Sequence, residues 1–109
     1  MPEFSLEQMA ILERLGSHGF VPVAFPLYAN AIGIRRGNCA ALLKPLAAGG
    51  FLIYGEPCIL LDGNLTVRIT RAGRSWFVWK QKRREATPQF LAELESFVSE
   101  LKSLLAPRA

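Results

Sequence analysis

The residues best suited to chemistry lie between positions 66 and 84, where basic and aromatic side chains are interleaved. The basic residues of this stretch are Arg68, Arg71, Arg74, Lys80, Lys82, Arg83 and Arg84. Phe77 and Trp79 stand among them. Cationic side chains contact phosphates, and aromatic rings stack on bases or on guanidinium groups. The basic residues are therefore candidate anion or nucleic-acid contacts, and Phe77 and Trp79 are candidates for stacking or for an interface.

The charge of the chain is segregated. Residues 16–84 contain ten basic and two acidic residues, a net charge of +8, whereas residues 1–15 and 85–109 each carry −2. A basic surface attracts anionic partners, but Lys and Arg also solvate exposed strands and oppose edge-to-edge aggregation. The solvating role is the simpler interpretation, because the acidic ends weaken the field at a distance. We therefore expect any nucleic-acid binding to be weak.

Other common chemistries lack their residue patterns. Cys39 and Cys58 have no CxxC partner and lie in apolar runs, which predicts reduced, buried and unreactive thiols. The single histidine, His18, follows a predicted helix, and its charged form would stabilise the carboxyl end of that helix. The sequence has no zinc-ligand spacing, nucleophile elbow or phosphate-binding loop. We predict no catalytic residues, no cofactor and no metal site.

A small-ligand pocket or an enzyme of unknown type is a third candidate function, ranked below protein interaction and nucleic-acid binding. Tyr28, Tyr54 and Glu56 are its candidate residues, because they place polar groups among apolar neighbours. Nothing in their spacing identifies a reaction.

The first predicted element is a helix that begins at Leu6. Ser5 and Gln8 form a capping box, Phe4 can pack on Met9, and Gly16 is expected to end the helix. Residues 19–26 contain two prolines and predict an extended surface segment or an edge strand.

A second helix is predicted near the carboxyl end of the chain. Thr87 is its cap and Pro88 its first residue. Its apolar stripe comprises Phe90, Leu94, Phe97, Leu101 and Leu104, widened by Leu91, Val98 and Leu105. The cover expected for this stripe is the sheet of its own domain, and the alternative is a second copy of the helix in a dimer.

Short apolar runs between the helices predict antiparallel hairpins. Turns are expected at Arg36-Gly37, Asp62-Gly63 and Ala72-Gly73, and Gly49-Gly50 precedes a strand at 51–54. The second turn would pair Leu61 with Asn64, Leu60 with Leu65 and Cys58 with Val67. The third would pair Arg71 with Arg74, Ile69 with Trp76 and Val67 with Val78, so that three strands form a meander.

The turns at Asp62-Gly63 and Ala72-Gly73 also predict which residues share each face of the meander. The face expected to be core comprises Leu65, Val67, Ile69, Trp76 and Val78. The opposite face pairs Arg68 with Phe77 and Thr66 with Trp79, and we expect another layer to cover it in part. A second core layer or a dimer contact is therefore favoured there over a nucleic-acid platform.

The predicted fold is a single α+β domain over residues 1–109, with an N-terminal helix, an antiparallel meander of four to six strands and a long C-terminal helix on the sheet. No apolar run is long enough to span a membrane, and the first residues do not resemble a signal peptide, so we expect a cytoplasmic protein. Apolar residues on both sheet faces favour a non-enzymatic interaction module that pairs with itself or with another protein. The alternative is a nucleic-acid-binding domain that uses residues 68–84.

Overall fold

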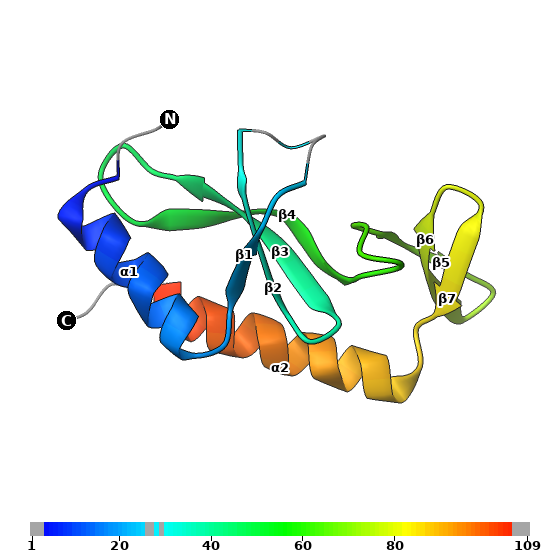
Figure 1. The fold of residues 1–109 in the computed structure, drawn as a ribbon. Helices are drawn as coiled ribbons and strands as arrows, with labels where there is room; N and C mark the ends of the chain where they lie inside the picture. Colours follow the sequence, from blue (N-terminus) through cyan, green and yellow to red (C-terminus); the bar gives the residue numbers. More distant parts are fainter. Residues whose placement is uncertain (1–3, 26–27, 29, 106–109) are drawn as a thin grey trace.

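The computed structural model describes residues 4–25, 28 and 30–105, which form two helices and seven strands (Figure 1). The elements are α1 (Leu6–Ser17), β1 (Val21–Val23), β2 (Ile32–Arg36), β3 (Cys39–Pro45), β4 (Phe51–Ile59), β5 (Val67–Arg71), β6 (Arg74–Trp79), β7 (Lys82–Glu85) and α2 (Pro88–Leu105). The fold is α+β, as predicted. In the described residues, neither helix has the length and apolar character needed to cross a membrane.

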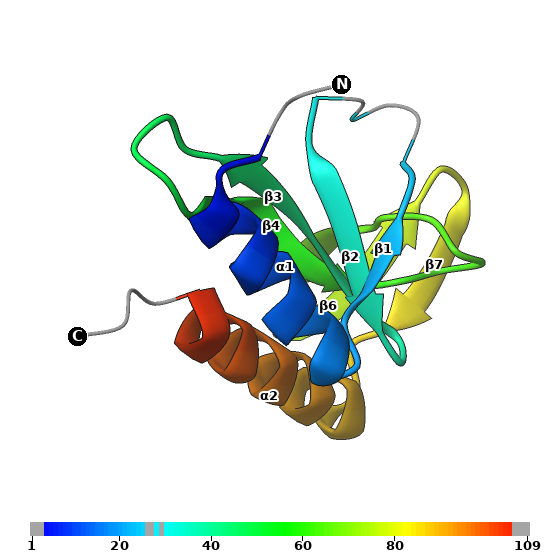
Figure 2. The same cartoon turned by 60° about the vertical axis from the view of Figure 1, so that its left-hand side comes forward.

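The strands form two antiparallel sheets rather than one. The first has the order β1-β2-β3-β4 and the second the order β5-β6-β7. Both helices lie on the same side of the four-stranded sheet (Figure 2). The small sheet lies beyond one end of the four-stranded sheet, next to the start of α2 (Figure 1).

The capping box of α1 is formed as predicted. The Gln8 backbone N–H donates to Ser5 Oγ at 3.1 Å, and the Ser5 N–H donates to Gln8 Oε1 at 3.0 Å. Phe4 packs on Phe51, with ring centroids 5.9 Å apart, while Met9 is mostly exposed. The predicted end at Gly16 is wrong, because the helix continues to Ser17 and Gly19 adopts the positive φ of 86° that ends such a turn.

The predicted extended segment contains the edge strand β1, which pairs with β2. Pro26, the last residue of that prediction, lies outside the described residues. The turn between β2 and β3 comes one residue later than expected, because Arg36 pairs with Cys39. The register predicted for β5 and β6 is confirmed at Arg71, Ile69 and Val67.

The predicted pairing across Asp62-Gly63 is formed only at its first step. Leu61 and Asn64 make an isolated bridge, but the expected pairs of Leu60 with Leu65 and Cys58 with Val67 are replaced by side-chain bonds. The Thr66 hydroxyl donates to the Ile59 carbonyl at 2.6 Å, and the Thr66 N–H donates to Cys58 Sγ at 3.4 Å. The ladder ends there, and β5 begins a separate sheet.

Helix α2 begins as predicted, with the Phe90 N–H donating to Thr87 Oγ1 at 3.2 Å. Leu94, Phe97 and Leu101 are buried, and α2 packs on β3, β4 and α1. The predicted cover by the sheet is confirmed, and the protein's own first helix completes it. The ring centroids of Phe97 and Phe20 lie 5.3 Å apart in this core.

The predicted core face of β5 and β6 is wrong. Val67 is 67% exposed and Ile69 43% exposed, whereas Phe77 on the opposite face is completely buried. Phe77 belongs to the same core as Leu94 and Phe97 of α2. The side of the small sheet that meets α2 therefore became the core, and the more aliphatic side was left without a cover.

Candidate functional site

The predicted basic residues all lie on the small sheet or in its turns, but they divide between its two faces. By the register of the sheet, Arg71, Arg74 and Arg83 share a face with Trp76 and with the exposed Val67 and Ile69. Arg68, Lys82 and Arg84 share the opposite face with Phe77 and Trp79. Lys80 lies in the turn between β6 and β7 and has a positive φ of 55°.

Two of these cations are neutralised by carboxylates. Arg74 pairs with Glu85 at 2.8 Å, and Lys82 pairs with Asp62. Within the part of the chain that the structure describes, the other cations make no ion pair: Arg68, Arg71, Lys80, Arg83 and Arg84. The small sheet therefore has a surplus of unpaired positive charge.

Several of these cations lie over the aromatic rings of their own chain. The guanidinium carbons of Arg74 and Arg83 are 5.6 Å and 5.4 Å from the Trp76 ring centroid. Lys80 lies over Trp79 at 4.8 Å. Because Phe77 is buried and Trp79 is partly buried beneath Lys80, an open stacking platform is not formed there. The expectation that this face is covered is confirmed for Phe77.

The exposed apolar residues of the strands gather on the side away from the helices. Residues facing the helices, such as Phe51 and Ile53, pack with the core, whereas their neighbours on β4 alternate to the other side. Val67 of β5 and Tyr54 of β4 line one cavity, so the start of the small sheet adjoins this side of β4, and Val67 and Ile69 lie on the side of the small sheet opposite Phe77. We call this surface the helix-free face; its exposed apolar residues are Val21, Leu52, Tyr54, Val67 and Ile69.

A cavity of about 290 Å³ lies between the two sheets on the helix-free face. We call it the tyrosine cavity; its lining includes Tyr28, Leu42, Tyr54, Glu56, Cys58, Thr66 and Arg68. The three residues that the sequence suggested for a pocket, Tyr28, Tyr54 and Glu56, are therefore brought together. Sequence reasoning missed Arg68 here, because it assigned that residue to a basic stretch and expected Cys58 and Val67 to close the gap by pairing.

Both cysteines are free and buried, as predicted. Burial raises the pKa of the Cys39 thiol from 9.0 to about 12, and the charge of Glu93 adds to this effect. Burial also raises the pKa of the Cys58 thiol, although hydrogen bonds from Thr66 oppose the shift. Thiols that stay protonated are poor nucleophiles and poor metal ligands. Over the described ranges, no three His, Cys, Asp or Glu side chains are grouped to hold a metal ion.

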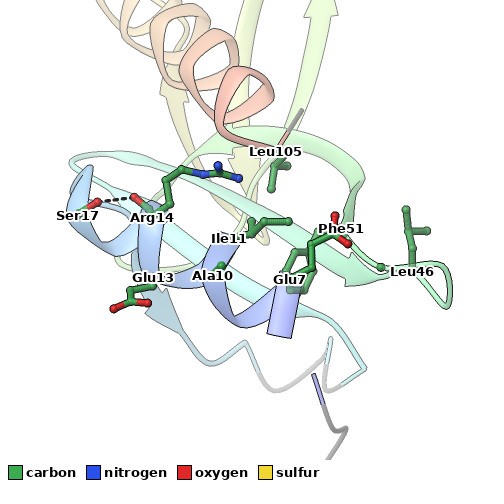
Figure 3. A pocket seen from close by; sticks show the side chains of 11 residues that line it. Glu7, Ala10, Ile11, Glu13, Arg14, Ser17, Leu46, Phe51 and Leu105 are labelled. Atoms are coloured by element: carbon green, nitrogen blue, oxygen red, sulfur yellow. Dashed lines mark hydrogen bonds between the residues drawn. The ribbon is translucent and has the colours of Figure 1, made fainter. Parts of the chain in front are cut away.

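A larger cavity, of about 870 Å³, lies between α1, the end of α2 and the loop that precedes β4 (Figure 3). Arg14 extends across it toward Leu105, over an apolar floor that includes Ile11 and Phe51. Arg14 Nε is buried and has no hydrogen-bond partner among the residues that the structure describes. A cation beside the last turn of a helix stabilises the end of its dipole, so this arrangement has a structural explanation. The acidic Glu7 and Glu13 that also line the cavity oppose the binding of an anion.

The chain matches no family model, no curated protein and no solved structure with which it was compared.

Proposed function

We propose that this chain is a non-enzymatic interaction module that binds a partner protein through its helix-free face. The exposure of Val67 and Ile69 supports the proposal most directly. Removing apolar side chains from water stabilises a contact by about 25 cal/mol per Å² of apolar surface. An exposed apolar surface of this kind is typical of a contact with another macromolecule. The proposal includes a cytoplasmic location, which the two free thiols support.

The charge of the same face favours an acidic partner. Arg71 and Arg83 lie beside the exposed aliphatic residues and make no ion pair in the described part of the chain. An acidic partner would neutralise them and associate faster through electrostatic steering. A second copy of the chain, the partner expected from the sequence, would instead bring like charges together.

A nucleic acid is the alternative partner, favoured by the unpaired cations and by the stacking of Arg74 and Arg83 on Trp76. Two observations favour a protein partner over a nucleic acid. Phe77 is buried, and the exposed apolar side chains of the small sheet, Val67 and Ile69, are aliphatic and offer no ring for a base.

The test is photo-crosslinking in the native cell, with a benzophenone amino acid replacing Val67. A matched protein carries the same probe at Met9, an exposed apolar residue on α1 that is 55% exposed against 67% for Val67. We expect an adduct from position 67 that nuclease leaves intact, and no such adduct from position 9. The double charge reversal Arg71→Glu with Arg83→Glu should remove the adduct, whereas the single charge reversal Lys102→Glu on α2 should not.

Three results would contradict the proposal. A nuclease-sensitive adduct would show a nucleic-acid partner, and an adduct found only at twice the mass of the chain would show that a second copy alone occupies this face. Equal adducts from both positions would show that the helix-free face has no special role.

A further inference from the structure

The tyrosine cavity has the size of a site for one small molecule. Ligand pockets usually enclose roughly 300–1,000 Å³, and this cavity of about 290 Å³ lies at the lower end of that range. It holds a ligand no larger than a single amino acid or a similar monomer. Buried Leu42 and Cys58 form an apolar part of the lining, and Tyr54 contributes an aromatic ring.

Two residues of opposite charge line this cavity without forming an ion pair with each other. Glu56 comes from β4 and Arg68 from β5, and both line the cavity. Among the described residues, neither side chain forms an ion pair or a side-chain hydrogen bond. A carboxylate and a guanidinium across one small cavity match a ligand that carries both charges, because each ligand charge then gains a charge-assisted hydrogen bond.

The other monomer classes fit this lining less well. Glu56 would repel a phosphate or a simple organic anion, and Arg68 would repel a simple cation. A neutral sugar would leave both charges without an ionic partner. Only a zwitterion uses both, and the apolar lining favours one with a hydrocarbon side chain.

We infer that the tyrosine cavity binds a free amino acid with an apolar or aromatic side chain. Its ammonium group lies toward Glu56, its carboxylate toward Arg68, and its side chain against Leu42 and Tyr54. The inference does not rest on the proposed protein interaction, because the charges that it uses belong to Glu56 and Arg68, although Tyr54 and Val67 border both the cavity and the helix-free face.

A second hollow provides a matched control. A groove of about 660 Å³ lies on the α2 side of Glu56 and Arg68, and it is lined by both of these residues together with Glu95 and Lys102 of α2. Glu95 and Lys102 do not line the tyrosine cavity. Variants of this second pair therefore distinguish the cavity from the groove.

The experiment is calorimetric titration of the full chain with L-phenylalanine, N-acetyl-L-phenylalanine and L-phenylalanine amide. The acetyl group removes the positive charge and the amide removes the negative charge. We expect L-phenylalanine to bind and each derivative to bind about tenfold more weakly or worse, because each loses a charge-assisted contact.

Variants assign each charge to its residue. Glu56→Gln should weaken the binding of L-phenylalanine until its affinity equals that of the N-acetyl derivative. Arg68→Gln should weaken the binding of L-phenylalanine until its affinity equals that of the amide. Both side chains are exposed, so both variants should keep the urea midpoint of the parent. Glu95→Gln and Lys102→Gln should leave the affinity unchanged.

Two results would overturn the inference. One is a calorimetric titration in which neither L-phenylalanine nor L-leucine gives a saturable heat of binding. The other is a loss of affinity in Glu95→Gln or Lys102→Gln that equals the loss in the cavity variants, since the ligand would then occupy the groove on α2.

Discussion

Glu100 connects three elements through its carboxylate. Arg36 of β2 donates to Glu100 Oε2 at 2.7 Å, and His18 Nδ1 at the end of α1 lies 3.3 Å from Oε1. The Arg36 hydrogen bond is the main cause that lowers the pKa of Glu100 from its ordinary 4.5, with His18 adding to it and desolvation opposing it. This carboxylate therefore holds α1, β2 and α2 together only while it is ionised.

The first prediction concerns the pH dependence of this contact. Because the pKa of Glu100 is lower in the folded state, its ionised form adds stability above pH 4.5, and that stability is lost as the pH falls through the folded value. Glu100→Gln should lower the urea midpoint at neutral pH, and its difference from the parent should shrink in acid. Glu95→Gln, an exposed neighbour on the same helix, is the control. An equal difference at all pH values would contradict the ionic role.

The second prediction concerns the buried thiols. With the pKa of Cys39 at about 12, the thiol stays protonated in the folded protein at mildly alkaline pH. Iodoacetamide should therefore modify neither cysteine quickly in the native protein, and intact mass should count two modified thiols after unfolding in urea. The same shift stabilises the folded state below pH 9.0, an effect lost as the pH rises toward about 12. Fast labelling of native Cys39 would refute this account.

At the scale of elements, Gly33 allows β1 and the segment after it to approach β2. A Cβ at this position would lie 2.3 Å from the Val23 carbonyl oxygen and 2.4 Å from the Phe25 ring. Gly33→Ala should lower the free energy of unfolding by about 1–3 kcal/mol, because the clash includes backbone. Gly16→Ala is the matched control, since a Cβ there meets nothing within 4 Å, and it should stabilise α1 by about 0.5–1 kcal/mol. Equal effects in urea unfolding would contradict this reading.

The packing of α2 is tested at Phe97, which is 1% exposed. Phe97→Ala removes a ring from the core shared with Phe20 and should cost about 3–5 kcal/mol of unfolding free energy. Ser96→Ala, at the exposed neighbour, should change it little. An unchanged urea midpoint in Phe97→Ala would show that α2 is not part of the stabilising core.

At the scale of the whole molecule, self-association stays a prediction, with one of its two grounds removed. The stripe of α2 is covered by α1, β3 and β4, but the helix-free face is not covered by a helix. Its apolar residues favour contact between two copies, whereas the unpaired cations of the small sheet oppose it. Sedimentation should therefore show a dimer fraction at micromolar concentration that increases with salt. A dimer that dissociates as salt is raised would contradict this balance of forces.

The local features of the fold were predictable from the sequence, because they depend on residues close together in the chain. Ser5 and Gln8 cap α1, Thr87 caps α2, and Ala72-Gly73 sets the register of β5 and β6. Hydrogen bonds within one turn and the φ preferences of glycine are enough to produce these features. The same local reasoning placed Arg68, Arg71 and Arg74 on the hairpin of β5 and β6, but it did not predict β7, which carries Lys82, Arg83 and Arg84.

Only the tertiary structure decided which face of that sheet is buried and what lies beside it. The strand pattern gives apolar residues to both faces, so the choice depends on where α2 lies, and α2 packs on the side of Phe77. The gap between β4 and β5 likewise depends on Thr66, whose bonds to Cys58 and Ile59 replace the ladder. That gap brings Glu56 and Arg68 to one cavity. Contacts between distant residues set these features, because side-chain alternation specifies two faces but does not specify which of them meets a helix.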